Sequence, residues 1–444
     1  MAPVEQYVFA GVRSNIGRFH CREWCSAQRI RITMIASGNH SIIQMNGSPT
    51  VGFGHFDHSE RMPIIVNCQL SIVNSAKPLN NNLPSQHGGW GRLGGTEMIY
   101  FNNDYSEGCH EKVLEALTKS NLEQTPGYGE DGHCRRAAER IRGLCKREDL
   151  AVHFLVGGTQ ANLTVIDAGL RPHQGVLAAE SAHIHVHETG AVEATGHKVL
   201  ALPSADGKIT AGQVAAAVEE HRTNSSFEHM VQPKMVYISN PTEVGTLYTL
   251  EELEELSRVC REKGLYLFLD GARLGYGLEA KGYDVTLPDI ARLCDVFYIG
   301  GTKVGALFGE AVVIANPRLQ EDFRYLIKLH GGMLAKGRLL GIQFEVLMED
   351  GLYFEIAARA DALADRIRSA LDRAGFPLLY PGVTNQIFAV FPDRVLEELE
   401  KRYVFCPDRR VDEGHRAVRI CTSWATREEA VEQLCRDIEK FTGR

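Results

Sequence analysis

The chain has 444 residues, of which 44% are hydrophobic and 23% are charged, and its formal net charge is −8. This composition is ordinary for a globular protein of roughly two or three domains, and the acidic balance argues against a nucleic acid or an anionic membrane as the partner. No apolar run reaches the ~18 residues of a membrane-spanning helix. The 11 cysteines are scattered without a C-x-x-C pair, which favours reduced thiols in a cytoplasmic protein over disulfides or a structural zinc.

The first 97 residues differ in texture from the rest of the chain. Polar and glycine-rich stretches such as Asn80–Asn82 and Gly88–Gly91 interrupt every candidate helix or strand. An isolated strand in such a segment has no core to join. We therefore expect residues 1–97 to form a poorly ordered extension, with the folded part beginning at Met98.

From residue 98 onward, short apolar stretches alternate with amphipathic ones. Strands rich in Val, Ile and Leu that alternate with helices are typical of a mainly parallel sheet covered on both faces. After Asn316 and Pro317 the pattern becomes helical and then mixed, which predicts a smaller C-terminal α+β domain. The expected domains are 98–319 and 320–444, and the expected strands of the larger one are 152–156, 176–179, 198–202, 235–238, 265–269, 296–299 and 311–314.

A glycine-containing turn follows the first of these strands and opens a helix. The amides at a helix N-terminus, together with the hydroxyl of Thr159, would form an anion cradle suited to phosphate beside Gly157 and Gly158. The turn is neither a nucleotide P-loop nor a G-x-G-x-x-G dinucleotide fingerprint. Because glycines are common at strand–helix turns, a turn without any ligand is the plain alternative.

An aspartate and a lysine stand at the ends of two later strands. Asp270 closes an apolar strand, where a carboxylate is either a helix N-cap or the partner of a buried cation. Lys303 lies in the small-residue loop Gly300–Gly305, which gives its amine room to react with a carbonyl. A solvated lysine and a surface pair of Asp270 with Arg273 are the alternatives. Together with the glycine turn, however, these residues indicate a pyridoxal-phosphate site, since ligands of parallel sheets bind at the carboxyl ends of the strands.

His183, His185 and His187 form the densest histidine cluster of the chain. On an extended strand the three would share one face and could bind zinc or iron, which would suit a metal-dependent hydrolase. Against this reading, the following residues look helical and no matching ligand stands elsewhere. The other use is a single histidine that stacks on an aromatic cofactor and serves in proton transfer.

Taken together, these motifs resemble the threonine aldolase branch of the beta-eliminating lyase family, pyridoxal-phosphate enzymes of the aspartate-aminotransferase fold type (fold type I). The resemblance runs from about residue 100 to residue 436 and implies a mostly parallel seven-stranded sheet flanked by helices, plus a small C-terminal α+β domain. The stretches that carry it are 157–162, 182–184 with Glu188 and Gly190, 270–274, 300–303 and 418–424.

The resemblance implies a cofactor, pyridoxal 5'-phosphate, and a set of residues that would bind it. These comprise the phosphate turn, the stacking histidine, the aspartate of the ring nitrogen with its neighbouring arginine, and the Schiff-base lysine with the hydroxyl residue before it. They are Gly158, Thr159, Gln160, His183, Asp270, Arg273, Thr302 and Lys303. Among these, Lys303 and His183 would be the catalytic residues.

For the substrate, the resemblance implies that Arg419 grips the carboxylate of an amino acid, together with Arg273. Asn103 stands where a serine is usual, and Glu243 stands where many aldolases carry a histidine near the substrate hydroxyl. The implied reaction is cleavage of a β-hydroxy-L-amino acid, such as threonine or allo-threonine, to glycine and an aldehyde. The expected assembly is a homodimer or homotetramer.

Other functions stay open at this point. The same site could support β-elimination or transamination, the histidine cluster could belong to a metal hydrolase, and a binding protein without catalysis is a further alternative.

Overall fold

The computed structural model describes residues 31–35, 65–69 and 98–442 of the chain. The chain divides into two units, residues 1–90 and 91–444. Within the first unit, β1 (Arg31–Ile35) and β2 (Ile65–Gln69) pair as an antiparallel two-stranded sheet. The rest of the segment that we expected to be a poorly ordered extension, residues 1–97, lies outside the described residues.

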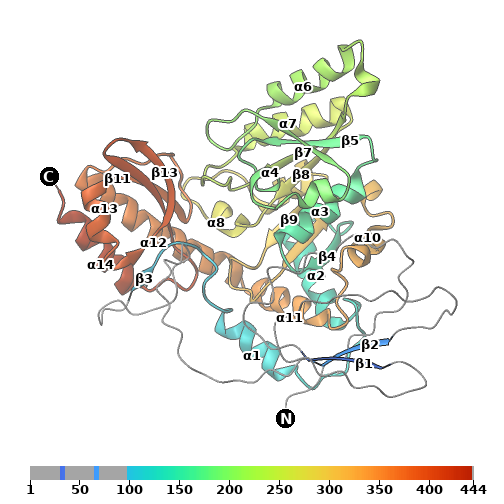
Figure 1. The fold of residues 1–444 in the computed structure, drawn as a ribbon, viewed down its shortest axis with the longest axis horizontal. Coiled ribbons are helices and arrows are strands. Elements are labelled where there is room, and N and C mark those ends of the chain that lie inside the picture. Colours follow the sequence, from blue (N-terminus) through green and yellow to red (C-terminus); the bar gives the residue numbers. More distant parts are fainter. Residues whose placement is uncertain (1–30, 36–64, 70–97, 443–444) are drawn as a thin grey trace. The chain divides into compact units, whose positions relative to one another are not determined.

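A seven-stranded sheet forms the centre of the second unit, with the strand order β4-β10-β9-β8-β7-β5-β6 (Figure 1). Strands β5 to β9 run parallel to one another, whereas β10 runs antiparallel to both of its neighbours, β9 and β4. The strands are β4 (Ala151–Leu155), β5 (Gln174–Ala179), β6 (Lys198–Leu202), β7 (Gln232–Ser239), β8 (Tyr266–Asp270), β9 (Val296–Gly300) and β10 (Glu310–Ile314). The predicted mostly parallel seven-stranded sheet is therefore confirmed.

Helices cover this sheet in two layers. In one layer, neighbouring helices contact each other in the series α6, α7, α9 and α2, and in the other α3 packs along β4, β10, β9 and β8. Because both faces are covered, every residue of β5, β9 and β10 is buried, which explains why these strands are apolar apart from Gln174 and Glu310 at the first positions of β5 and β10. These helices are α2 (Gly132–Cys145), α3 (Gly158–Gly169), α6 (Ala211–Thr223), α7 (Leu250–Lys263) and α9 (Leu287–Leu293).

Local signals in the sequence fix the ends of these helices. At the start of α7, Thr249 and Glu252 form a capping box, in which each side chain accepts a hydrogen bond from the other residue's backbone. The helix ends at Gly264, whose φ of 68° lies in the left-handed region that glycine adopts without strain.

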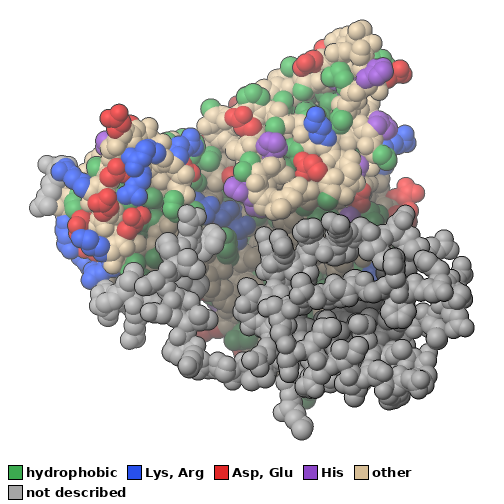
Figure 2. Space-filling model, in the orientation of Figure 1, with side chains coloured by type: hydrophobic (Ala, Val, Ile, Leu, Met, Phe, Trp, Pro, Cys, Tyr) green, Lys and Arg blue, Asp and Glu red, His purple; other side chains and the backbone are tan. Residues whose placement is uncertain are grey.

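A smaller antiparallel sheet with the order β11-β14-β13 forms a C-terminal lobe that has its own hydrophobic core. Its elements are β11 (Gln386–Pro392), α13 (Asp393–Leu399), β13 (Cys406–Asp412), β14 (His415–Cys421) and α14 (Glu428–Glu439). Figure 2 shows basic and acidic side chains intermixed over this lobe on the face that is drawn. The predicted small C-terminal α+β part of the fold is confirmed.

The two cores are joined by α12 (Leu352–Ala374), which contributes residues up to Ala360 to the large core and residues from Leu363 onward to the small one. At the other end of the lobe, β3 (Ile99–Tyr100) pairs in parallel with β12 (Tyr403–Val404). The division that we expected between residues 319 and 320 stays a prediction, since residues 323–360 pack on the large core and the rest of α12 packs on the small one.

The remaining helices are short and border the large sheet. They are α1 (Glu111–Lys119), α4 (His183–Val186), α5 (Ala191–Ala194), α8 (Leu274–Leu278), α10 (Phe323–Leu329) and α11 (Arg338–Leu347), with 3-10 turns at Phe227–His229 and Pro317–Leu319. Among the described residues, no helix is long and apolar enough to cross a membrane.

Candidate active site

The carboxyl ends of β4, β8 and β9 bring three of the predicted motifs to one edge of the sheet. Asp270 is the last residue of β8, and Gly300 at the end of β9 leads into the loop that carries Lys303. The glycine turn after β4 opens α3, and from this helix Asn162 donates a hydrogen bond of 3.1 Å to Oδ2 of Asp270. The helix that follows the glycine turn is thereby in contact with the aspartate.

Lys303 lies in the hairpin that joins β9 to the antiparallel β10. The amides of Gly301 and Thr302 both donate to the carbonyl of Gly309, at 3.0 and 3.1 Å, and these bonds close the base of the hairpin. Gly305 has a φ of +84°, and a Cβ there would lie 2.6 Å from Ile356 Cδ1, so only glycine fits. Burial, and then the charge of Arg273, lower the pKa of Lys303 below its ordinary value, although nearby carboxylates oppose this.

Asp270 is buried and accepts several hydrogen bonds. The hydroxyl of Tyr237 and the amide of Asn162 donate to Oδ2, and the backbone N–H of Ala272 donates to Oδ1 at 2.9 Å. Burial and the charge of Asp270 raise the pKa of Tyr237, so that its hydroxyl stays a donor. These hydrogen bonds fix the position of the Asp270 side chain at the sheet edge.

His183 begins the short helix α4 and is connected to Asp270 through two other side chains. Its Nδ1 lies 2.8 Å from Oε1 of Glu188, and the same oxygen accepts a bond of 2.8 Å from Nδ2 of Asn162. The amide of Asn162 thereby bridges the carboxylates of Glu188 and Asp270. The bond to Glu188 raises the pKa of His183, although burial opposes it.

The three clustered histidines do not share one face. His183 and His187, one helical turn apart, have ring centroids separated by 5.6 Å, while His185 is exposed. Across the described residues, no group of three or more His, Cys, Asp or Glu side chains is arranged to hold a metal ion.

Glu243 lies beside His183. Its Oε1 accepts hydrogen bonds from the backbone N–H of His183 at 2.9 Å and from the hydroxyl of Ser239 at 2.7 Å. Burial raises the pKa of Glu243 above its ordinary value, while these hydrogen bonds oppose the shift. A carboxyl group with a raised pKa is a better proton acceptor than an ordinary glutamate.

Arg273 is occupied by a buried partner that the sequence did not indicate. Its Nε and Nη2 donate to the two oxygens of Asp104, at 2.7 and 2.9 Å, and Asn385 donates to the same carboxylate at 2.9 Å. Burial alone would raise the pKa of Asp104, but Arg273, Lys303 and Asn385 outweigh it, and the pKa is lowered.

Arg419, in contrast, has unused hydrogen-bonding capacity. Among the described residues it makes only long bonds, from Nη1 to Gln386 Oε1 at 3.4 Å and from Nη2 to the carbonyl of Asn102 at 3.3 Å, and its buried Nε has no partner there. Burial, and then the charges of His183 and Arg419, lower the pKa of His187.

Two other predicted site residues, Gln160 and Asn103, form hydrogen bonds with neighbouring protein groups. Gln160 donates to the carbonyl of His330 at 3.0 Å and accepts from the N–H of Val156 at 3.2 Å. Asn103 accepts bonds from the N–H of Tyr105 and the hydroxyl of Ser106, which closes a local turn.

Thr302 is held within the Lys303 hairpin. Its hydroxyl donates to Oε1 of Glu310 at 2.8 Å and accepts from the N–H of Gly309 at 3.0 Å. Glu310 was missed in the sequence, although a charged residue at the head of the apolar strand β10 is a signal that could have revealed it.

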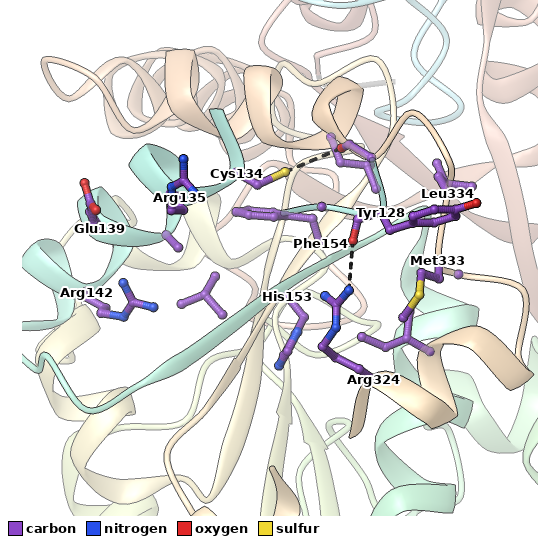
Figure 3. A pocket seen from close by; sticks show the side chains of 17 residues that line it. Tyr128, Cys134, Arg135, Glu139, Arg142, His153, Phe154, Arg324, Met333 and Leu334 are labelled. Carbon is purple, nitrogen blue, oxygen red and sulfur yellow. Dashed lines mark hydrogen bonds between the residues drawn. The ribbon is translucent and has the colours of Figure 1, made fainter. Parts of the chain in front are cut away.

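A separate cavity of about 310 Å³ lies beside the edge strand β4, between α2 and the segment that joins α10 to α11 (Figure 3). Arg324 and His153 point into it, as Figure 3 shows, and Arg324 donates to the carbonyl of Tyr128 at 3.2 Å. None of the residues predicted for the site lines this cavity.

The sheet with one antiparallel strand, the small antiparallel lobe and the polar cluster at the carboxyl edge define a protein of the aspartate-aminotransferase fold class. A single-mutant aspartate aminotransferase of Thermus thermophilus superposes with a TM-score of 0.57 at 17% identity, over 78% of this chain and 92% of that one, which shows the fold alone.

The family Beta-eliminating lyase matches residues 104–393, and the chain belongs to this family, on the threonine aldolase branch that its motifs predicted. A low specificity L-threonine aldolase of a Pseudomonas species is 32% identical over 346 residues, which cover 76% of this chain and 96% of the relative. The corresponding enzyme of Pseudomonas aeruginosa is 30% identical over 78% of this chain and 98% of its own. A solved threonine aldolase of Leishmania major superposes with a TM-score of 0.76 at 46% identity, over 78% of this chain and 100% of that one.

Proposed function

We propose that this protein is a pyridoxal-phosphate-dependent lyase that cleaves a β-hydroxy-L-amino acid of the threonine type to glycine and an aldehyde. The observation that carries the proposal is the convergence of Lys303 and Asp270 on one sheet edge, in a chain whose relatives are threonine aldolases. This edge is where open α/β sheets bind their ligands.

The residues present fit the cofactor. The first amides of α3 have no side-chain cap, and a Cβ at Gly157 would meet nothing within 4 Å, so open space lies beside the start of a helix, where N–H groups suit a phosphate. A Cβ at Gly158 would lie 3.0 Å from the hydroxyl of Tyr298, so this position favours glycine. A buried carboxylate on β8 suits a protonated ring nitrogen.

We assign the binding of the cofactor to the residues that the resemblance implied. The phosphate falls to the turn at Gly158 and Thr159, with Gln160 supporting it through its bonds to Val156 and His330. His183 and Asp270 would bind the ring of the cofactor, and Lys303 would bond to its carbonyl carbon. Thr302 holds the hairpin that carries Lys303. When bound, the cofactor supplies an electron-accepting ring that lets a bond at the substrate's Cα break.

Arg419 binds the substrate carboxylate in this proposal, because its guanidinium has donors to spare. Arg273 supports the same region from its fixed position on Asp104, and Asn103 orders the neighbouring turn. A clamped carboxylate orients the scissile bond and so lowers the entropic part of the barrier.

Glu243 faces the substrate hydroxyl in this proposal and takes its proton as the Cα–Cβ bond breaks. The hydroxyl of Ser239 and the backbone N–H of His183 both donate to Oε1, which fixes the position of the carboxyl group beside His183. The raised pKa of Glu243 favours proton uptake. His183, whose proton is shared with Glu188, holds a second ionisable group at the same place.

The proposal is tested by a visible spectrum of the purified full-length protein, repeated on Lys303→Ala, together with product analysis on L-threonine and L-allo-threonine. We expect an absorbance band of the bound cofactor that is lost with Lys303, and glycine and acetaldehyde as products. Ammonia and a keto acid without glycine would instead assign the site to β-elimination or transamination, and absence of the band from both proteins would remove the cofactor.

The proposal also includes the cellular location and the assembly of the protein. The cysteines described in the structure are free thiols, which supports a cytoplasmic location. A homodimer or homotetramer of a chain divided into 98–319 and 320–444 completes the proposal, and light scattering of the purified protein tests the assembly.

A further inference from the structure

The base of the Lys303 hairpin contains a buried carboxylate that has no part in the function proposed above. Glu310 begins β10 opposite Gly300 and Leu155, and only 3% of its surface is exposed. Buried glutamates are costly unless they are paired with a cation or play a chemical role. The position of this one therefore needs an explanation.

Glu310 organises the hairpin that presents Lys303. Its Oε2 accepts a hydrogen bond of 3.1 Å from the N–H of Gly301, and its Oε1 accepts one of 2.8 Å from the hydroxyl of Thr302. The residues immediately before Lys303 are therefore fixed by one side chain. The orientation of the lysine follows from these bonds because Val304 N–H and Ala306 N–H both donate to Gly301 as well.

Three carboxylates act electrostatically on Lys303, and two of them are satisfied by other groups. Asp104 is neutralised by Arg273 through two hydrogen bonds, and Asp270 accepts bonds from Tyr237, Asn162 and the N–H of Ala272. Glu310 makes no ion pair to an arginine or lysine of its own within the described residues, and Lys303 is the cation that acts on it.

The coupling runs in both directions. Burial raises the pKa of Glu310 to about 7, while the charge of Lys303 holds it down. In return, Glu310 raises the pKa of Lys303 against the effects of burial and Arg273. The other ionisable groups that act on this pair are Arg273, Asp104, Asp270, Tyr298 and Tyr353, and burial keeps the two tyrosines neutral by raising the pKa of each.

We infer that Glu310 is a positioning residue for Lys303: its hydrogen bonds to Gly301 and Thr302 hold the hairpin that presents the amine, and its charge acts on that amine. The inference rests on the proposed function, since the charge state of Lys303 matters only if its amine bonds to an aldehyde. An ionised Glu310 favours the ammonium form of Lys303, and an uncharged side chain in its place favours the amine.

The test measures the reactivity of Lys303 itself in the full-length chain after removal of the cofactor. Acetaldehyde and cyanoborohydride label neutral amines, and peptide mass spectrometry follows the Lys303 peptide between pH 6 and pH 10. In Glu310→Gln, we expect the midpoint of labelling to fall by about one pH unit, equivalent to roughly tenfold faster labelling at a fixed pH below the midpoint.

Two variants separate charge from shape. Glu310→Asp keeps the charge but is too short for both hairpin bonds, so its midpoint should stay near that of the wild type. Asp361→Asn is a matched control, because Asp361 is another buried carboxyl, 4% exposed, that does not act on Lys303. An unchanged midpoint in Glu310→Gln, or an equal shift in Glu310→Asp or Asp361→Asn, would overturn the inference.

If Glu310→Gln does not fold, the reciprocal effect can be measured on Lys303→Ala. The titration of Glu310 is seen as the pH range over which the unfolding midpoint falls. Removal of the lysine charge should raise the upper end of this range by about one pH unit. An unmoved range would overturn the inference. The labelling does not depend on lyase activity, so failure of the proposed function appears separately, as a missing visible band.

Discussion

Removing Asp104 should destabilise the protein far more than removing a carboxylate from its surface. The side chain of Asp104 is fully buried and that of Arg273 is 13% exposed, and two hydrogen bonds join them. In Asp104→Asn the guanidinium keeps its charge without a counter-charge, and breaking a buried pair in this way costs about 3–5 kcal/mol. The amide of Asn385 loses its charged acceptor as well.

Urea unfolding at pH 7, followed by circular dichroism, measures this loss. The matched control is Glu115→Gln, which breaks the ion pair between Glu115 and Lys119. These two side chains are 61% and 73% exposed, so the control should leave the unfolding midpoint unchanged. A second variant, Asp104→Asn with Arg273→Met, removes both charges and should recover part of the loss.

The difference in unfolding free energy between the wild type and Asp104→Asn should depend on pH, in a direction that follows from the pKa of Asp104. Because the pKa of Asp104 is lowered in the folded state, the pair stabilises above the ordinary aspartate pKa of 3.8 and loses its contribution as the pH falls through the lowered value. The gap between wild type and Asp104→Asn should therefore narrow in acid. A loss no larger than that of Glu115→Gln at pH 7 would refute the reasoning.

Three further predictions concern the hydrogen bonds of the site. Glu188→Gln should return the pKa of His183 toward its ordinary value. It should also remove the stabilisation that protonated His183 gives the folded state, which is complete below pH ~6.5 and is lost as the pH rises through the raised pKa. An unchanged histidine NMR titration would contradict this. Tyr237→Phe removes a donor from the buried Asp270 and should cost about 1–3 kcal/mol in urea unfolding, with no loss as the opposing result. Because burial raises the pKa of Glu310 from 4.5 to about 7, the stability of the cofactor-free chain should decline by about 3 kcal/mol between those pH values, and Glu310→Gln should flatten this decline; equal slopes would count against it.

The large sheet could be predicted because its strands are buried on both faces. Burial makes β5, β9 and β10 apolar after their first residues, and helices with clear caps separate most of the strands. The strand β13 could not be predicted in this way, since most of its residues are exposed and its sequence is polar. It is a strand because its backbone bonds to β14, a partner that no local pattern indicates.

The site residues also divide into those that could be predicted from the sequence and those that depend on tertiary contacts. Asp270 and Lys303 could be placed together because the ends of parallel strands share an edge, which is a property of the fold class. The pair of Arg273 with Asp104 joins positions 169 residues apart, and either side chain alone looks like an ordinary surface charge. Glu243 and His183 were both recognised, but the bond between them depends on how α4 begins.

The histidine cluster was ambiguous because its interpretation depended on backbone conformation. Extended backbone would have aligned all three rings, whereas the short helix α4 leaves His185 exposed and turns His183 toward Glu188. A cluster of like residues therefore gave no information on function until its secondary structure was known.

The continuity of α12 has a mechanical consequence. With 23 residues it is about 35 Å long, and it acts as a rigid lever between the two lobes. Near its start, the hydroxyl of Tyr353 donates to the carbonyl of Gly300, three residues before Lys303, and farther along the carbonyl of Ala360 accepts a bond from Thr422, three residues after Arg419. A movement of the small lobe, which carries Arg419, relative to the hairpin would therefore bend α12 or turn it about Tyr353, so that α12 couples the position of Arg419 to that of Lys303.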